Sequence, residues 1–183
     1  SATDQYYTLN YDKFGRMTTG VHSLKKFNET IGSYDLNGNI KSLTRTANGS
    51  TFDNFTYTYN GNRLTNLSGI SGTYTYDNSG NLTYDPRKNL NFTWNSLNLL
   101  REVKSGSTIK AKYRYSYDGV KMKVEDANNI NGYDYLGSLV LVKTNNIITP
   151  ECHFGEGIIK GNEVMYFEKD HLGSIRTVLN ISG

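Results

Sequence analysis

Two neighbouring pairs of residues have the side chains that nucleophilic catalysis requires. Cys152 and His153 place a thiol beside an imidazole, the pair that cysteine nucleophiles use. Because adjacent residues of an extended strand point to opposite faces, these two cannot form a dyad if the segment is a strand. Asp170 and His171 supply two residue types of a Ser-His-Asp triad, but no Gly-x-Ser-x-Gly turn provides the nucleophile. We therefore predict that the chain is not an enzyme and has no catalytic residue.

The three histidines and the aspartates of turn-like segments are the candidate metal ligands. His22, His153 and His171 show no His-x-x-x-His spacing. The segment that begins at Asp77 resembles the first half of a calcium loop, but its twelfth position, which requires a bidentate Glu, is Lys88. We predict no metal site and no cofactor, and expect Asp77 to cap a turn.

A glycine-rich segment and the aromatic residues are the remaining candidates for binding. Residues 155–161 have the glycine count of a phosphate loop, but no helix-forming run follows them, which favours a β-turn. The 15 Tyr, 7 Phe and 1 Trp could form a platform on which sugar rings stack. A sugar platform would concentrate a few rings beside Asp, Asn and Arg. The rings follow a repeat instead, which favours an aromatic ladder that holds a sheet together.

The repeat has the template Tyr-Asp-x-x-Gly-x-apolar and positions most of these side chains. Complete copies lie at residues 11–17, 34–40 and 76–82. We interpret four further segments as shortened or altered copies: 59–64, 94–99, 117–122 and 133–139. An Asp or Asn after the ring can accept a hydrogen bond from the backbone two residues on, and the Gly can adopt a positive φ. Each copy is therefore predicted to contain a tight turn.

Strands are predicted on both sides of each turn. Rings alternate with polar residues at 55–59, 74–76, 92–94 and 113–117, a period of two that places the rings of a segment on one face. We predict an all-β fold, a curved meander of antiparallel hairpins from residue 5 to about residue 145. One face of the sheet carries the rings, and the other carries Thr, Ser, Lys and Asn.

Length and composition set the domain organisation. The 183 residues include only four Ala and two Pro, which disfavours helices and a separate second domain. We predict a single domain, residues 1–183, with a more apolar terminal part at 146–183 and strands buried on both faces at 139–142 and 147–148. The lone Cys152 excludes an internal disulfide and is expected to be buried.

Charge and hydropathy exclude several partners. A net charge of +3 without blocks of like charge predicts neither nucleic acid nor an anionic membrane as partner. No stretch of about 18 apolar residues forms a transmembrane segment, and residues 1–7 lack the layout of an export signal.

At these motifs the sequence resembles the RHS/YD-repeat family, which is named after the Tyr-Asp pair. Residues 166–176 are similar to the Asp-His-Leu-Gly-x-x-Arg signature of the RHS-associated core. Segments 149–151 and 155–157 resemble short-repeat versions common in gut Bacteroidetes. The resemblance implies a hollow β-shell that encloses a C-terminal cargo, often a toxin, in secreted or surface proteins. It also implies structural roles for Asp170, His171, Gly173 and Arg176: Asp bonds a turn, Gly takes a positive φ and Arg pairs with a carboxylate or carbonyl.

The sequence departs from this family in two respects. It has no Asp-Pro-rich self-cleavage segment or cargo before its end at Gly183, and it is far shorter than a complete cocoon. We therefore expect either an arc of an RHS-like shell or a small closed β-barrel. The predicted function is a non-catalytic shell or scaffold, secreted or on the bacterial cell surface, with a cargo or toxin as partner. The alternative is a stand-alone surface module that binds glycans or mediates adhesion, and the oligomeric state stays open.

Overall fold

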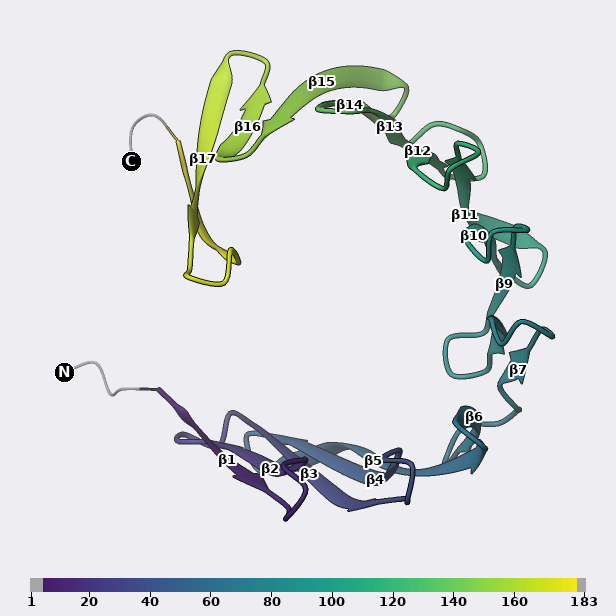
Figure 1. Ribbon diagram of the computed structural model, residues 1–183, viewed down its shortest axis with the longest axis vertical. Coiled ribbons are helices and arrows are strands. Elements are labelled where there is room, and N and C mark those ends of the chain that lie inside the picture. Colours follow the sequence, from purple (N-terminus) through teal and green to yellow (C-terminus); the bar gives the residue numbers. More distant parts are fainter. Residues whose placement is uncertain (1–4, 181–183) are drawn as a thin grey trace. The chain divides into compact units, whose positions relative to one another are not determined.

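The computed structural model describes residues 5–180. Within this range the regular secondary structure consists of β-strands (Figure 1). The chain divides into two compact units, one up to Lys88 and one from Asn89 on, which are described separately. The first unit contains the strands β1 (Tyr7–Tyr11), β2 (Met17–His22), β3 (Phe27–Tyr34), β4 (Ile40–Ala47), β5 (Ser50–Asn60), β6 (Arg63–Leu67), β7 (Thr75–Tyr76) and β8 (Leu82–Asp85). The second contains β9 (Leu90–Trp94), β10 (Leu100–Ser105), β11 (Thr108–Tyr115), β12 (Lys121–Glu125), β13 (Gly132–Leu136), β14 (Leu139–Thr144), β15 (Ile147–Phe154), β16 (Gly157–Lys160), β17 (Glu163–Lys169) and β18 (Ile175–Asn180).

The predicted antiparallel meander is confirmed in both units. In the first unit, β1 to β6 form one sheet in chain order, each strand antiparallel to the next, and β7 pairs with β8. In the second unit, β9 to β18 also follow one another in chain order. Register shifts at several turn-proximal ends are bulges, which bend and twist the strands.

Neither sheet closes on itself within the described residues. The first has β1 and β6 as different end strands, and β18 of the second pairs only with β17. The closed β-barrel, one of the two expected forms, is therefore wrong for these sheets. The more apolar terminal part was predicted to begin at residue 146, which lies between β14 and β15, inside the second unit. Whether the two units fold as one domain stays a prediction.

The two faces of the first sheet differ as predicted. In β5 the rings of Phe55, Tyr57 and Tyr59 are half-buried, and the Thr residues between them are exposed. Tyr57 and Tyr59 stack with ring centroids 6.4 Å apart. Leu43 on β4 is 4% exposed and lies opposite both Ile31 and Phe55. The core is thus a row of apolar side chains along one face, which we call the ring face.

The terminal strands are more exposed than the sequence predicted. Ile147 and Ile148 on β15 are 69% and 55% exposed, and Cys152 on the same strand is exposed too. Of residues 139–142, only Val140 is buried. The expectation of strands buried on both faces is wrong because neither unit has a second layer of secondary structure to cover its sheet.

The surface area of the chain reflects this one-layered construction. The chain exposes 12443 Å², whereas a compact monomer of 20.6 kDa is expected to expose about 8,900 Å². No side chain of the described residues is completely buried. A large apolar area therefore stays accessible on the sheets.

Candidate functional site

The predicted Asp turn is clearest at Asp35. Its Oδ1 accepts hydrogen bonds from the backbone N–H groups of Asn37 and Asn39, at 2.9 and 2.8 Å. Its Oδ2 accepts a hydrogen bond from the Asn39 side-chain amide at 2.9 Å. The Gly38 N–H donates to the Asp35 carbonyl, and Gly38 has a φ of +85° that a residue with a Cβ adopts only with strain. The carboxylate thus closes the turn on itself.

The same backbone pattern recurs in both units. In each copy the N–H of the turn residue donates to the carbonyl of the residue four or five positions later, and its own carbonyl accepts a hydrogen bond from the N–H of the residue three positions later. The turn residues with this pattern are Asp12, Asp35, Asp77, Asn95, Ser116, Asp126 and Asp170. Hydrogen bonds from within the turn hold the pKa of Asp77 below its usual value, first of all the one from the Asn81 amide. The carboxylate of Asp77 is thus occupied by its own turn, as the prediction of a turn cap requires.

One copy lies in a different register from the one that the sequence suggested. Ser116, not Asp118, occupies the Asp position, because its hydroxyl accepts the Val120 N–H and its carbonyl accepts the Gly119 N–H. The ring position is then Tyr115, and Tyr117 is 95% exposed.

The segment 133–139 contains no Asp turn. Asp134 lies within β13, and the hairpin turns between Leu136 and Leu139. A further copy at Asp126 was missed, because Asn129, with a φ of +55°, stands where the template has Gly.

The segment that resembles the RHS-associated core is another copy of this turn. Asp170 Oδ1 accepts hydrogen bonds from the N–H groups of Leu172 and Ser174, and Gly173 has a φ of +83°. The Arg176 guanidinium lies 3.9 Å from Asp170 Oδ2. These are the structural roles that the resemblance implied. His171 is exposed in the turn.

The remaining chemical candidates are not brought together. Cys152 and His153 are successive residues of β15, so they point to opposite faces, and His153 lies 3.6 Å from Glu151 instead. His22 is buried, where its Nδ1 accepts the Leu24 N–H and its ring meets Tyr7 edge-on. Over residues 5–180, no group of three potential ligands could hold a metal ion. The segment 155–161 forms hairpin turns that flank β16.

A contact that the sequence did not reveal links successive copies of the repeat. In the first unit, the hydroxyls of three ring-position Tyr residues donate to the carbonyl of the apolar residue that ends the preceding copy. These hydrogen bonds run from Tyr34 to Met17 at 2.5 Å, from Tyr59 to Ile40 at 2.7 Å and from Tyr76 to Leu64 at 2.9 Å. We call this series the tyrosine ladder. The recurrence of Tyr, rather than Phe, at the ring position was the signal available in the sequence.

The turns of adjacent copies also contact one another. The Arg16 guanidinium lies 4.4 Å from the ring centre of Tyr34, and that of Arg63 lies 5.8 Å from the ring centre of Tyr76. The Nη2 atom of Arg63 also lies 3.1 Å from the position that a Cβ on Gly80 would occupy. A cation over an aromatic face stabilises such a contact by about 0.5–1 kcal/mol at exposed sites. The tyrosine ladder and the guanidinium groups of Arg16 and Arg63 together set the spacing of successive hairpins at the end of the strands where the Asp turns lie.

The ring face of the first unit is hollowed at the opposite ends of the strands. This aromatic depression has a volume of about 360 Å³. It is lined by Tyr7, Leu9, Met17, Gly20, Phe27, Asn28, Glu29, Arg45 and Phe52. The rings of Tyr7, Phe27 and Phe52 are 51–58% exposed. Several exposed rings thus gather beside the charged side chains of Glu29 and Arg45.

A chain of charges lies along one side of the depression. Arg45 Nε donates to Glu29 Oε2 at 2.6 Å, and Arg45 Nη1 lies 3.4 Å from Asp53. Asp53 in turn forms an ion pair with Arg87 at 3.2 Å. The Arg87 guanidinium lies over the ring of Phe55. The hydrogen bond to Glu29 is the main reason why the pKa of Arg45 is raised. The guanidinium therefore stays charged, with planar donors fixed beside the rings.

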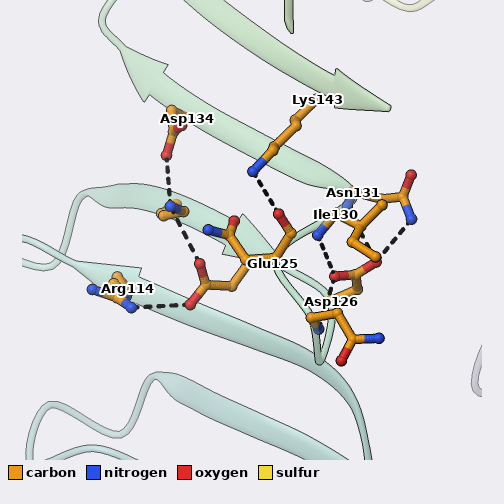
Figure 2. A network of polar contacts seen from close by, with 10 residues as sticks. Arg114, Glu125, Asp126, Ile130, Asn131, Asp134 and Lys143 are labelled. Carbon is orange, nitrogen blue, oxygen red and sulfur yellow. Dashed lines mark hydrogen bonds and ion pairs between the residues drawn. The ribbon is translucent and has the colours of Figure 1, made fainter. Parts of the chain in front are cut away.

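The second unit has a polar network, drawn in Figure 2. The strand register places it on the face opposite Tyr113 and Tyr133. Glu125 is 5% exposed and accepts from Arg114 at 3.0 Å and from Lys123 at 3.2 Å. Lys123 also reaches Asp134 at 3.7 Å. Burial acts to raise the pKa of Glu125, but the hydrogen bonds from Arg114 and Lys123 outweigh it and hold the pKa below its ordinary value. The network joins β11, β12 and β13.

Comparison with solved structures identifies similar folds. A crystal structure of TcdB2-TccC3-Cdc42 matches with a TM-score of 0.51 and 19% identity, over 96% of this chain and 13% of that chain. A crystal structure of TcdB2-TccC3 without its hypervariable C-terminal region matches with a TM-score of 0.49, 19% identity and the same coverage. The Tc holotoxin pore of Photorhabdus luminescens matches at 0.41 and 14% identity, over 94% and 14%.

At 19% identity, the first match bears on the fold alone: it shows that the hairpin meander occurs in the TcdB2-TccC3-Cdc42 structure. This chain spans about an eighth of the matched chain. No protein-family model matches the sequence, and no curated protein does. No helix in the described part of the chain is long and apolar enough to cross a membrane.

Proposed function

We propose that this chain is a non-enzymatic section of an RHS/YD-type β-wall that encloses a polypeptide cargo in a larger exported or surface-displayed protein. The observation that carries the proposal is the one-layered sheet whose ring face stays exposed. The chain exposes about 3,500 Å² more surface, polar and apolar together, than a compact monomer of its mass, and the rings of Tyr7, Phe27 and Phe52 are 51–58% exposed. A cargo laid against this face would remove these rings from water, which is favourable.

The repeat supplies the other property of a wall, which is uniform extension. Copies in both units use the same backbone turn, and in the first unit the copies at Tyr34, Tyr59 and Tyr76 each donate a Tyr hydroxyl to the preceding copy. Stability in such an array comes from each unit and its contacts with its neighbours. The face of Thr and Asn side chains, which pair across strands as Asn10–Thr19 and Thr44–Asn54 do, would face water. The ring face would face the cargo.

The similarity to a Tc toxin structure supports this proposal at the level of fold. The RHS/YD resemblance of the repeat adds the cargo, a toxin being the usual kind, and a location outside the cell or on its surface. Since the chain spans 13% of the matched chain, it would form one section of a wall.

A probe with the properties of an unfolded cargo tests the proposal. Reduced, carboxymethylated lactalbumin stays unfolded and can be titrated against the chain by fluorescence anisotropy. Phe27→Ser, on the ring face, is expected to weaken binding several-fold because Phe27 is 58% exposed there. Val21→Ser is the matched control, because Val21 is exposed on the opposite face of the same sheet. Absence of binding, or equal effects of both substitutions, would contradict the assignment of the ring face to cargo.

The aromatic depression favours a second candidate function, the binding of a glycan. Exposed rings beside Asn28, Glu29 and Arg45 form the concentrated cluster that a sugar platform requires. A glycan array followed by titration of the best ligand tests it. Phe52→Ala should abolish binding, and Phe14→Ala, which removes a 70% exposed ring in a turn, should leave it unchanged. An array without hits removes this candidate and leaves the first untouched.

A further inference from the structure

The polar network of the second unit borders a hollow with a volume of about 360 Å³, which we call the charged hollow. This volume lies in the range of sites that bind small molecules. The lining side chains are mostly charged, unlike those of the aromatic depression: Arg101, Glu102, Lys112, Tyr113, Arg114 and Glu125. A ligand that fits this hollow must therefore be recognised by its charge.

A buried carboxylate organises two cations beside the charged hollow. Arg114 and Lys123 lie directly opposite each other on β11 and β12, a position in which like charges repel. Glu125 is 5% exposed and contacts both, at 3.0 and 3.2 Å (Figure 2). The Arg114 guanidinium uses its Nη2 in this contact, and within residues 5–180 its Nε and Nη1 donors make no hydrogen bond. Since this side chain is 68% exposed, Glu125 holds in place a guanidinium whose other donors are accessible.

Lys112 and Arg101 bring two more cations to the charged hollow. Lys112 lies opposite Glu102 on β10 and Glu125 on β12, yet it forms no ion pair with any described residue, and Glu102 pairs with Lys104 at 2.7 Å instead. Arg101 has no partner in β9, because a bulge shifts the register there. A bulge re-aims a side chain, so Arg101 lines the same hollow as its neighbour Glu102. Arg101 also forms no ion pair in the described part of the chain.

The charges around the hollow do not balance. The charged residues that line it, together with their ion-pair partners, are five cations and three carboxylates: Arg101, Lys104, Lys112, Arg114 and Lys123, with Glu102, Glu125 and Asp134. Two positive charges are therefore in excess. A phosphate monoester carries about −1.5 to −2 charges at pH 7 and presents three acceptor oxygens. It matches both the excess charge and the three lining cations that have unused donors.

We propose that the charged hollow binds a phosphate dianion, either free or as the monoester of a small molecule. Arg114 donates to the phosphate through its planar guanidinium, and Lys112 and Arg101 supply ammonium and guanidinium donors from the neighbouring positions. A carboxylate matches less well, because it brings one charge and two oxygens. The phosphodiester of a nucleic acid backbone also brings only one charge per phosphate. The proposal concerns the polar face of the second unit and does not depend on cargo or glycan binding.

Titration with inorganic phosphate and, separately, with glucose 6-phosphate tests the proposal. Two-dimensional ¹H–¹⁵N NMR at constant ionic strength should show saturable shifts of backbone amides in β10, β11 and β12. Arg101→Gln and Lys112→Gln should each weaken binding about 2- to 5-fold, and the double variant about 10-fold. Neither side chain forms an ion pair within residues 5–180, so these variants should fold as the unaltered chain does. Tighter binding of glucose 6-phosphate would identify the ligand as an ester, and tighter binding of inorganic phosphate would identify it as the free ion.

Two controls separate a site from a general attraction of anions. Lys121→Gln removes the same charge as Lys112→Gln, but its ammonium lies over the ring of Tyr113, 5.5 Å from the ring centre, and Lys121 does not line the charged hollow. This variant should bind phosphate as the unaltered chain does. Acetate at the same ionic strength should cause no saturable shifts. Absence of saturable shifts with both phosphates, equal effects of Lys112→Gln and Lys121→Gln, or the same response to acetate would overturn the proposal.

Discussion

Removal of single hydroxyls from the tyrosine ladder should destabilise the first unit by a predictable amount. Tyr34, Tyr59 and Tyr76 each donate one hydrogen bond, of 2.5–2.9 Å, from a half-buried ring to a backbone carbonyl. Such a bond contributes about 1 kcal/mol to the free energy of unfolding. Each Tyr→Phe substitution should therefore lower the urea midpoint by about 0.5 M if the dependence on urea is about 2 kcal/mol per M.

The triple variant should lose about 3 kcal/mol, since the three bonds join different pairs of copies and should act nearly additively. Urea unfolding followed by circular dichroism measures these changes. Tyr117→Phe is the control, because Tyr117 is 95% exposed and its hydroxyl takes no part in the ladder. If the ladder substitutions lower stability no more than Tyr117→Phe does, the hydroxyls do not hold the copies together and the reasoning fails.

Four further measurements test the turn, the charge pattern, the core and the domain organisation. Gly38→Ala should cost about 1 kcal/mol in urea unfolding, because a φ of +85° strains a Cβ even where nothing else touches it; an unchanged midpoint would contradict this. The pKa of Asp77 is lowered in the folded state, so its contribution is complete above the unfolded-state value near 4 and is lost as the pH falls through the folded value; Asp77→Asn should flatten the acid limb of a plot of urea midpoint against pH, and an identical limb refutes the assignment. Leu43→Ala should lower stability by about 2 kcal/mol and Leu36→Ala should have no effect, because Leu43 is buried and Leu36 is fully exposed; equal losses would show that the ring face is not the core. Trp94, the only Trp, reports on the second unit, so coincident urea transitions by its fluorescence and by circular dichroism are expected of a single domain, and separate transitions would divide it.

Local chemistry allowed the turns to be predicted from the sequence. Asp35 and Gly38 act within a few bonds of one another, so their types and spacing suffice to specify the hydrogen bonds and the positive φ. The alternation of rings and Thr in β5 likewise determined which face carries the rings. The same reasoning placed one copy wrongly, at Asp118, because a serine hydroxyl can replace the carboxylate and Ser116 gives no Tyr-Asp pair to recognise.

What required the tertiary structure was everything that depends on residues far apart in the chain. The tyrosine ladder joins residues 12 to 19 positions apart, and the aromatic depression gathers side chains from five strands. The exposure of Ile147, Ile148 and Cys152 depends on the absence of a second layer over β15 in its own unit. A sequence determines by itself the contacts whose partners lie within one turn or strand, because their geometry is set by the intervening bonds. Burial and contacts between copies depend on which strands lie side by side, and this is decided only when the whole sheet forms.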